Sequence, residues 1–275
     1  MFKGLSSRAI GAKHIEENIP CQDYAGHYCD EKFGVAVVSD GHGNKKHFRS
    51  DKGSEIAVKV SIEAIKEFIG RESEYIHSLF DEPDKRLSQL ESNIVYRWNN
   101  MVMSHLNENP IAEEELLLYG NNAAEKSTTI YGATLIIAAI TEKYWFALQT
   151  GDGSCVTVFD KENAKIFVPD DDRLAFNFTT SLCDSDAAGN FRHYFSRINE
   201  EKPMPLGIIV STDGVSNSFE EVSFLSFNNK VLELLRTRDD ALREIETFLP
   251  ELSEKGSRDD VSIAAVYVEL NSDKE

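Results

Sequence analysis

The chain has 275 residues, of which 41% are hydrophobic and 28% are charged, and this balance is typical of a folded protein rather than a disordered or collagen-like chain. Its formal net charge of −18 argues against nucleic acid as a partner, because that binding depends on Lys and Arg displacing counterions from phosphates. The same charge would repel any anionic ligand unless a cation lies at its binding site.

No part of the sequence indicates export or membrane insertion. The first ten residues carry two basic side chains without an apolar run behind them, which is not the pattern of a signal peptide. No stretch approaches the ~20 consecutive apolar residues that cross a bilayer. The four cysteines form no CxxC pair and are too few for a disulfide framework. We therefore expect a cytoplasmic protein that does not bind membranes.

The first half of the chain predicts one buried strand followed by two long helices. Residues 33–39 form a short apolar run, which indicates the strand. Apolar residues then recur at helical spacing over residues 56–68 and again over residues 87–102. Residues 110–127 begin with acidic side chains and include Gly120-Asn121-Asn122, so we expect a surface connection there.

The second half predicts a cluster of strands and one more helical region. Apolar runs rich in Val, Ile, Ala and aromatic residues predict strands at residues 129–140, 144–150, 155–159 and 206–211. Residues 160–205 show no clear period, and we expect them to form an irregular flap. Helical spacing returns over residues 231–248, and a last strand is predicted at residues 261–270.

The order of these elements favours one domain built around packed sheets. No internal repeat, low-complexity tract or linker divides the chain, so residues 1–275 are expected to form a single domain. The strands cluster after a pair of helices, which favours sheets packed together with helices outside them over a strict alternation of strand and helix.

Aspartates stand at the ends of several predicted strands. Asp40, Asp152 and Asp213 follow three of the strands, each beside a glycine, and Asp259 with Asp260 precedes the last strand. An Asp-Gly pair taken alone is first of all a turn signal. Four acidic strand ends gathered at one edge would however repel one another without a cation. Because Mg²⁺ and Mn²⁺ prefer carboxylate and carbonyl oxygens, we predict a metal site that includes Asp40, Asp213 and Asp259.

Five segments, in this order, resemble the motifs of type 2C metal-dependent serine/threonine protein phosphatases, and the match is to bacterial-like members. They are Ser39-Asp40-Gly41-His42-Gly43, Gly132-Ala133-Thr134-Leu135, Gly151-Asp152-Gly153, Ser211-Thr212-Asp213-Gly214-Val215 and Ser257-Arg258-Asp259-Asp260-Val261-Ser262. They cover the chain from about residue 8 to residue 268. The resemblance implies an α+β fold, with a central antiparallel β-sandwich flanked by helices on both sides in four layers, α/β/β/α.

The resemblance also implies two divalent ions, Mn²⁺ or Mg²⁺, in a cleft at one end of the sandwich. Matched residue by residue, Asp40 would bridge the two ions, and the carbonyl oxygen of Gly41 would join one of them. Asp213 and Asp259 would hold the other ion.

Gln22 and Asn217 depart from the family pattern. Gln22 and Asp23 stand where the family has a Glu-Asp pair, so Asp23 keeps the family's aspartate and would bind metal directly or through water. The Gln22 amide could ligate without adding charge, and it would then hold one ion more weakly. Asp152 matches an aspartate that some bacterial members use for a third, looser ion. Asn217 stands where such members often have another Asp, so a third ion stays an open question.

His42 corresponds to the family residue proposed as the general acid that protonates the leaving alkoxide, and imidazole suits that role because it titrates near neutral pH. The alternative is a loop histidine that only forms hydrogen bonds. The family often has an Arg that grips the phosphate, but Asn18 occupies the nearest matching position, so this contact is unassigned. His47 and His105 lie in no motif, and no role is predicted for them.

These matches predict a monomeric enzyme that hydrolyses phosphoserine and phosphothreonine in phosphorylated protein substrates. Two ions would bind a water, lower its pKa and direct it at phosphorus, without a covalent phosphoenzyme. Gln22 and Asn217 would also suit a catalytically weak or inactive relative that acts as a phosphoprotein-binding scaffold. Metal chemistry alone leaves open a two-metal phosphoesterase for small phosphorylated metabolites.

Overall fold

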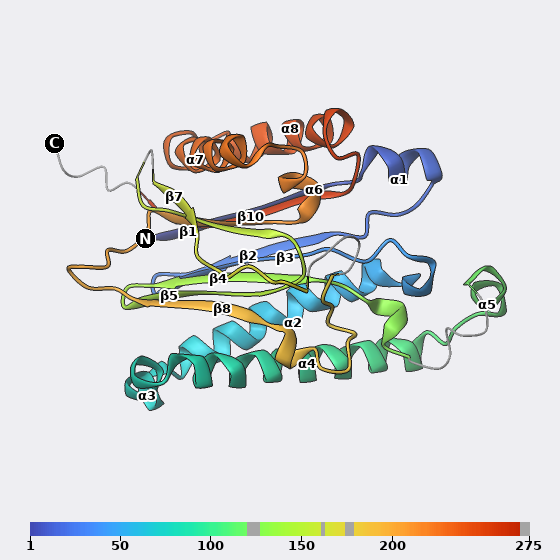
Figure 1. Cartoon of the computed structure of the whole chain (residues 1–275), viewed down its shortest axis with the longest axis horizontal. Helices are drawn as coiled ribbons and strands as arrows, with labels where there is room; N and C mark the ends of the chain where they lie inside the picture. The colour runs from blue at the N-terminus through green and yellow to red at the C-terminus, as the bar shows by residue number, and fades with distance from the viewer. Residues whose placement is uncertain (120–126, 161–162, 174–178, 270–275) are drawn as a thin grey trace.

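Two antiparallel five-stranded sheets lie face to face within residues 1–119, 127–160, 163–173 and 179–269, which this computed structural model describes (Figure 1). Sheet A has the strand order β1 (Phe2–Ala9), β10 (Val261–Val268), β9 (Gly207–Ser211), β6 (Ser154–Val158), β7 (Ala164–Ile166). Sheet B has the strand order β2 (Tyr24–Cys29), β3 (Phe33–Ser39), β4 (Leu135–Thr141), β5 (Tyr144–Thr150), β8 (Arg192–Arg197).

Helices cover the outer face of each sheet (Figure 1). On sheet B lie α2 (Ser50–Gly70) and α4 (Pro83–Glu108), and on sheet A lie α7 (Glu221–Thr237) and α8 (Ala241–Lys255). The shorter helices are α1 (Ala12–Glu17), α3 (Ile76–Asp81), α5 (Glu113–Tyr119) and α6 (Asp213–Ser216). This arrangement confirms the predicted α+β fold with four layers. Within the described ranges, no helix combines the length and the apolar composition that a membrane span requires.

The central strands are apolar on both faces because each face contacts a separate core. In β3, Val35 and Val37 point toward α2 and α4, whereas Ala36 and Val38 point into the space between the sheets. β10 alternates in the same way between the helices on sheet A and the space between the sheets. A strand covered on both sides has no solvent-facing positions, so it appears in the sequence as a continuous apolar run.

Helices α2 and α4 and the segment before β4 meet in a closely packed junction. That segment is a short 3₁₀ helix, η4 (Thr129–Tyr131). The indole Nε1 of Trp98, on α4, donates a 3.0 Å hydrogen bond to the carbonyl oxygen of Gly53, on α2. A Cβ on Gly53 would lie 1.8 Å from the carbonyl oxygen of Tyr131, so a larger residue would force α2 away from η4.

Some element boundaries differ from those predicted. The strand expected at residues 129–140 begins only at Leu135, because residues 129–131 turn into η4. The single helical region expected at residues 231–248 belongs to two helices, since the chain takes an extended conformation at Arg238 between α7 and α8. The segment 160–205, expected to be irregular, contains both β7 and β8. The predicted connection 110–127 includes α5, and its residues 120–126 lie outside the described part.

Among the described residues, four strands were predicted by no apolar run, and they are β1, β2, β7 and β8. Each lies at the edge of its sheet, and each has partly exposed residues along its length. Their polar side chains face solvent at these edges, so the apolar signal in the sequence is weak.

Candidate metal centre

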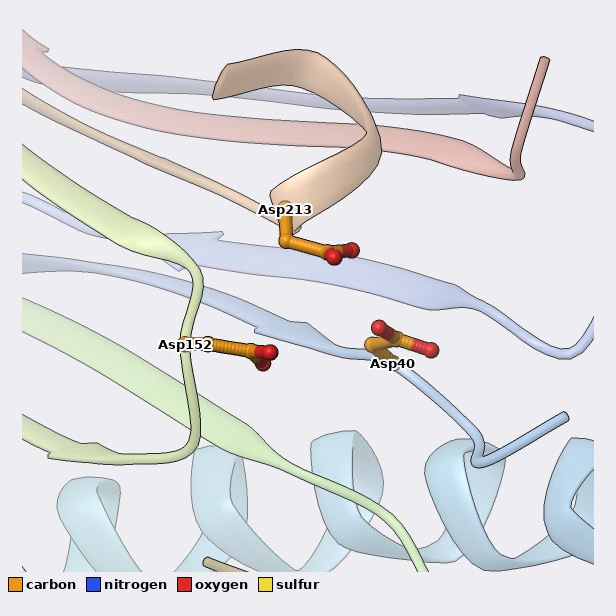
Figure 2. A group of neighbouring side chains, drawn as sticks. All are labelled: Asp40, Asp152 and Asp213. Carbon is orange, nitrogen blue, oxygen red and sulfur yellow. The ribbon is translucent and has the colours of Figure 1, made fainter. Parts of the chain in front are cut away.

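Three carboxylates meet at one end of the two sheets (Figure 2). Asp40, Asp152 and Asp213 each offer an oxygen, and these oxygens all lie within 4.8 Å of one another. Figure 2 shows the three side chains pointing toward a common space. We call these three residues the acidic cluster.

Strand direction explains why residues so far apart in sequence form the acidic cluster. Both β3 and β5 are antiparallel to β4, so they run in the same direction, and Asp40 and Asp152 follow their carboxyl ends. In sheet A, β9 ends at Ser211, and Asp213 begins α6 two residues later. The acidic cluster therefore lies where strand ends of both sheets come together.

The backbone at Asp40 is fixed by the segment that leads into β4. Its N–H donates to the hydroxyl of Thr134 at 3.0 Å, and its carbonyl oxygen accepts from the Thr134 N–H at 2.8 Å. The next residue, Gly41, donates its N–H to the carbonyl oxygen of Gln22. A Cβ at Gly41 would lie 2.6 Å from that same oxygen, so this close approach requires glycine.

The other two members of the acidic cluster are held in different ways. Asn217, on the turn after Asp213, donates a 3.0 Å hydrogen bond from its amide to the Asp213 carboxylate. Asp152 is exposed and accepts a 3.2 Å hydrogen bond from the Thr179 hydroxyl. Gly151, which precedes Asp152, has a φ of +98°, a conformation that favours glycine.

The acidic cluster is electrostatically strained in the absence of a cation. Burial raises the pKa of the Asp40 carboxyl well above its ordinary value, and the four charged neighbours that add most to this shift are all aspartates. The pKa of Asp213 rises to about 6, first through burial and then through repulsion by Asp152. A divalent cation bound among these oxygens would relieve the repulsion, and hard oxygen ligands are those that Mg²⁺ and Mn²⁺ prefer.

These pKa shifts predict how metal stabilises the protein at different pH values. In the metal-free protein, Asp213 and Asp23 have pKa values raised from 3.8 to about 6 and about 8. The folded state therefore binds more protons than the unfolded state in this window, so stability falls as pH rises through it. A divalent ion needs deprotonated carboxylates, so we expect Mn²⁺ to raise Tm more at about pH 8 than at about pH 5.5. Calorimetry with Mn²⁺ and with chelator measures this, and an equal gain at both pH values would contradict it.

Asp259 does not belong to the acidic cluster, although the sequence predicted that it meets Asp40 and Asp213. Its side chain is more than half exposed, and its Oδ1 lies 3.9 Å from Nε2 of His14. Asp259 is nevertheless close enough to help raise the pKa of both Asp40 and Asp213. The structure therefore joins Asp152, rather than Asp259, directly to the other two carboxylates.

Asp23 and Gln22 lie close to Asp40, since Asp23 is among the charged neighbours that raise the pKa of Asp40 and the Gln22 carbonyl accepts the N–H of Gly41. Asp23 is fully buried and accepts a 2.7 Å hydrogen bond from the Thr212 hydroxyl. Burial, followed by repulsion from Asp260, raises its pKa to about 8. The Gln22 amide nitrogen donates to Ser50 at 2.7 Å, while its buried Oε1 has no hydrogen-bond partner in the described part of the chain. A buried amide oxygen without a donor is suited to a cation.

A buried ion pair that the sequence did not predict, between His14 and Asp260, supports the Asp259 loop. Nδ1 of His14 lies 3.0 Å from Oδ1 of Asp260, and this interaction with Asp260 raises the pKa of His14. The Asp260 carboxylate also accepts 2.6 Å hydrogen bonds from the N–H groups of Gly11 and Gln22. Because these groups are about 240 residues from Asp260 in the chain, no local pattern could reveal the pair.

His42 lies two residues beyond Asp40, and its backbone N–H donates to the carbonyl oxygen of Gly132. Burial lowers the pKa of the imidazole to about 3, with smaller contributions from His47 and Lys46. The ring is therefore neutral at neutral pH in the absence of ligands.

Comparisons with known proteins agree with this architecture. The family model described as protein phosphatase 2C matches residues 10–250, and no curated protein matches the chain. A bacterial serine phosphatase is 15% identical, with a TM-score of 0.59 over 99% of this chain and 100% of its own. Serine/threonine phosphatase Stp1 from Staphylococcus aureus is 14% identical, with a TM-score of 0.59 over 98% and 96%.

The catalytic domain of the serine/threonine protein phosphatase PstP, solved in complex with two manganese ions, is 14% identical, with a TM-score of 0.54 over 98% of this chain and 99% of its own. At such identities these structures show a shared fold. The family model goes further, since the residues it matches include β3, β5 and β9 and all three members of the acidic cluster. The chain therefore belongs to the protein phosphatase 2C family and is a protein phosphatase.

Proposed function

We propose that this protein hydrolyses phosphoserine and phosphothreonine in other proteins, with Mn²⁺ or Mg²⁺ held by the acidic cluster. The observation that carries the proposal is the meeting of Asp40, Asp152 and Asp213 at one end of the sandwich, where burial and the neighbouring aspartates disfavour the charged forms of Asp40 and Asp213. The manganese ions in PstP and the serine/threonine substrates named for Stp1 and PstP support the same activity here.

The roles of the residues follow from their positions. Asp40 and Asp213 would hold the ions from the two sheets, and Asp152 would hold one from the exposed side. The carbonyl of Gly41, the Gln22 oxygen, Asp23 and Asp259 would add ligands directly or through water. Bound divalent ions would lower the pKa of an attacking water and offset the charge of the phosphate group. By offsetting the charge of the phosphate group, the ions would reduce the repulsion expected from a net charge of −18.

His42 would supply the proton that the leaving alkoxide needs. Its ring is neutral before the substrate binds, because burial lowers its pKa to about 3. A phosphate group bound beside the ring favours the protonated form, since a nearby opposite charge raises the pKa of an imidazole. Even the neutral ring carries one N–H that it can donate to the leaving oxygen.

Release of phosphate from a phosphothreonine peptide tests this proposal. We expect turnover with Mn²⁺ or Mg²⁺ and none with chelator, because the acidic cluster alone repels the substrate. Nucleotides and sugar phosphates, assayed in parallel, separate a protein phosphatase from a phosphoesterase for small metabolites. A protein that binds the phosphopeptide but releases no phosphate with either ion would instead be the inactive scaffold.

A further inference from the structure

A second histidine packs against His42. The ring centroids of His42 and His47 lie 4.8 Å apart, and the ring planes are tilted by 59°. Within the described ranges, no hydrogen bond to a ring nitrogen of His42 is found. The orientation of the His42 imidazole therefore depends on the groups that it packs against.

His47 is itself held in place from two sides. It ends a 3₁₀ helix, η1 (Lys45–His47), in which its backbone N–H donates to the carbonyl oxygen of Asn44 at 2.8 Å. Its ring is 5% exposed, and Nδ1 contacts the carbonyl oxygen of Thr129, on η4. A carbonyl oxygen can only accept, so Nδ1 carries the proton of this hydrogen bond. The His47 ring is thus buried and rotationally fixed.

The backbone at Gly132 completes the pocket for both rings. A Cβ on Gly132 would lie 2.4 Å from Nδ1 of His47 and 2.8 Å from Cδ2 of His42. The carbonyl oxygen of Gly132 accepts the His42 backbone N–H at 3.1 Å. The segment after η4 therefore holds the His42 backbone and leaves room for the two imidazoles side by side.

We propose that His47 is a positioning residue, which fixes the ring of His42 so that it can protonate the leaving alkoxide of a phosphorylated serine or threonine. This inference rests on the proposed function, because it takes His42 as the acid. It assigns a role to a residue that lies in no sequence motif. A general acid contributes about 10²- to 10⁴-fold, and this contribution requires its donor to lie within hydrogen-bond reach of the leaving oxygen.

The variant His47→Ala tests the role through the leaving group. With a phosphothreonine peptide we expect kcat to fall at least about 10-fold, because a displaced acid loses most of its contribution. With p-nitrophenyl phosphate, whose leaving phenolate needs no proton, we expect a change of less than about twofold. In a protein that already carries His42→Ala, His47→Ala should lower kcat little further, since the effects of substituting two residues that act as one unit are not additive.

His105→Ala is the matched control. Nδ1 of His105 lies 2.7 Å from the hydroxyl of Tyr131, so this histidine also contacts η4, but within the described ranges it forms no hydrogen bond or ring contact with His42. If His47 merely stabilises η4, both variants should reduce turnover alike and with both substrates. If His47→Ala does not fold, the variant His47→Phe keeps an aromatic ring at this position, and the same selective loss is expected because the hydrogen bond to Thr129 is gone.

NMR of the histidine rings provides a readout that does not depend on activity. The ring resonances of His42 should shift in His47→Ala and stay unchanged in His105→Ala. The proposal is overturned if those resonances do not shift, or if His47→Ala lowers kcat equally with both substrates. It is also overturned if the fall in kcat caused by His47→Ala adds fully to the fall caused by His42→Ala. A wild-type protein that releases no phosphate from either substrate would remove the proposed function instead, and the NMR comparison still reports whether His47 positions the ring.

Discussion

Replacing Asp40 with asparagine is expected to lower kcat/KM for a phosphothreonine peptide by at least about 100-fold, by analogy with the loss of other charge-stabilising groups in active sites. The amide keeps the shape of the side chain but removes one of the three charges of the acidic cluster. The backbone hydrogen bonds between residue 40 and Thr134 do not involve the carboxylate, so the loop should keep its conformation. Phosphate release measures the rate, and calorimetric titration measures the affinity for Mn²⁺.

The prediction for Asp40→Asn includes a gain in stability without metal. Because burial and the neighbouring aspartates raise the pKa of Asp40, its charged form is disfavoured in the folded protein. Removing that charge should raise Tm in the presence of chelator at neutral pH and abolish the increase that Mn²⁺ causes. Asp239→Asn, in the exposed turn between α7 and α8, makes the same charge change outside the acidic cluster and should leave activity unchanged. Activity of Asp40→Asn equal to wild type would remove the metal centre proposed here.

Replacing Trp98 with alanine is expected to lower the free energy of unfolding by about 3–5 kcal/mol, the usual cost of removing a large buried aromatic side chain. Trp98 is fully buried, and truncation leaves a cavity between α2, α4 and sheet B. It also leaves the Gly53 carbonyl without the indole donor at 3.0 Å. Urea unfolding in the presence of chelator measures the loss without a contribution from bound metal.

Tyr96→Ala is the matched control for Trp98→Ala, because Tyr96 lies on the same helix and is 66% exposed. A change at such a surface position is expected to stay within about 0.5 kcal/mol. Since Gly53 contacts η4, and η4 holds His47, Trp98→Ala should also loosen the pocket around His42. A loss below about 1 kcal/mol would show that the junction of α2, α4 and η4 repacks around the missing ring.

Elements buried on both faces were the easiest to predict. β3, β5, β9 and β10 appear as continuous apolar runs, because each lies between a helical layer and the opposite sheet. α2 and α4 were predicted from their helical spacing, since one face of each contacts sheet B. The edge strands β1, β2, β7 and β8 were missed because their partly exposed residues leave a weak apolar signal in the sequence. Two helices were predicted as one at residues 231–248, because apolar spacing continues past the turn at Arg238.

The sequence by itself determined which residues could form a metal site. It places aspartates and glycines directly at strand ends, and because of the strand directions Asp40, Asp152 and Asp213 lie at one end of the sandwich. Only the tertiary structure decided that Asp152, rather than Asp259, meets the other two. The reason is that distances between carboxylates depend on how the loops after β5 and before β10 pack, and these loops contact distant segments rather than their neighbours in sequence.

The contacts of the histidines also depend on tertiary structure alone. His47 reaches Thr129, and His14 reaches Asp260, across 82 and 246 positions of the chain. A local pattern records which face of a strand or helix is buried, but it carries no information about which distant segment covers that face. The strand order β1-β10-β9-β6 joins the two ends of the chain in one sheet. That joining brings the N-terminal His14 and Asp23 close to Asp260 near the C-terminus.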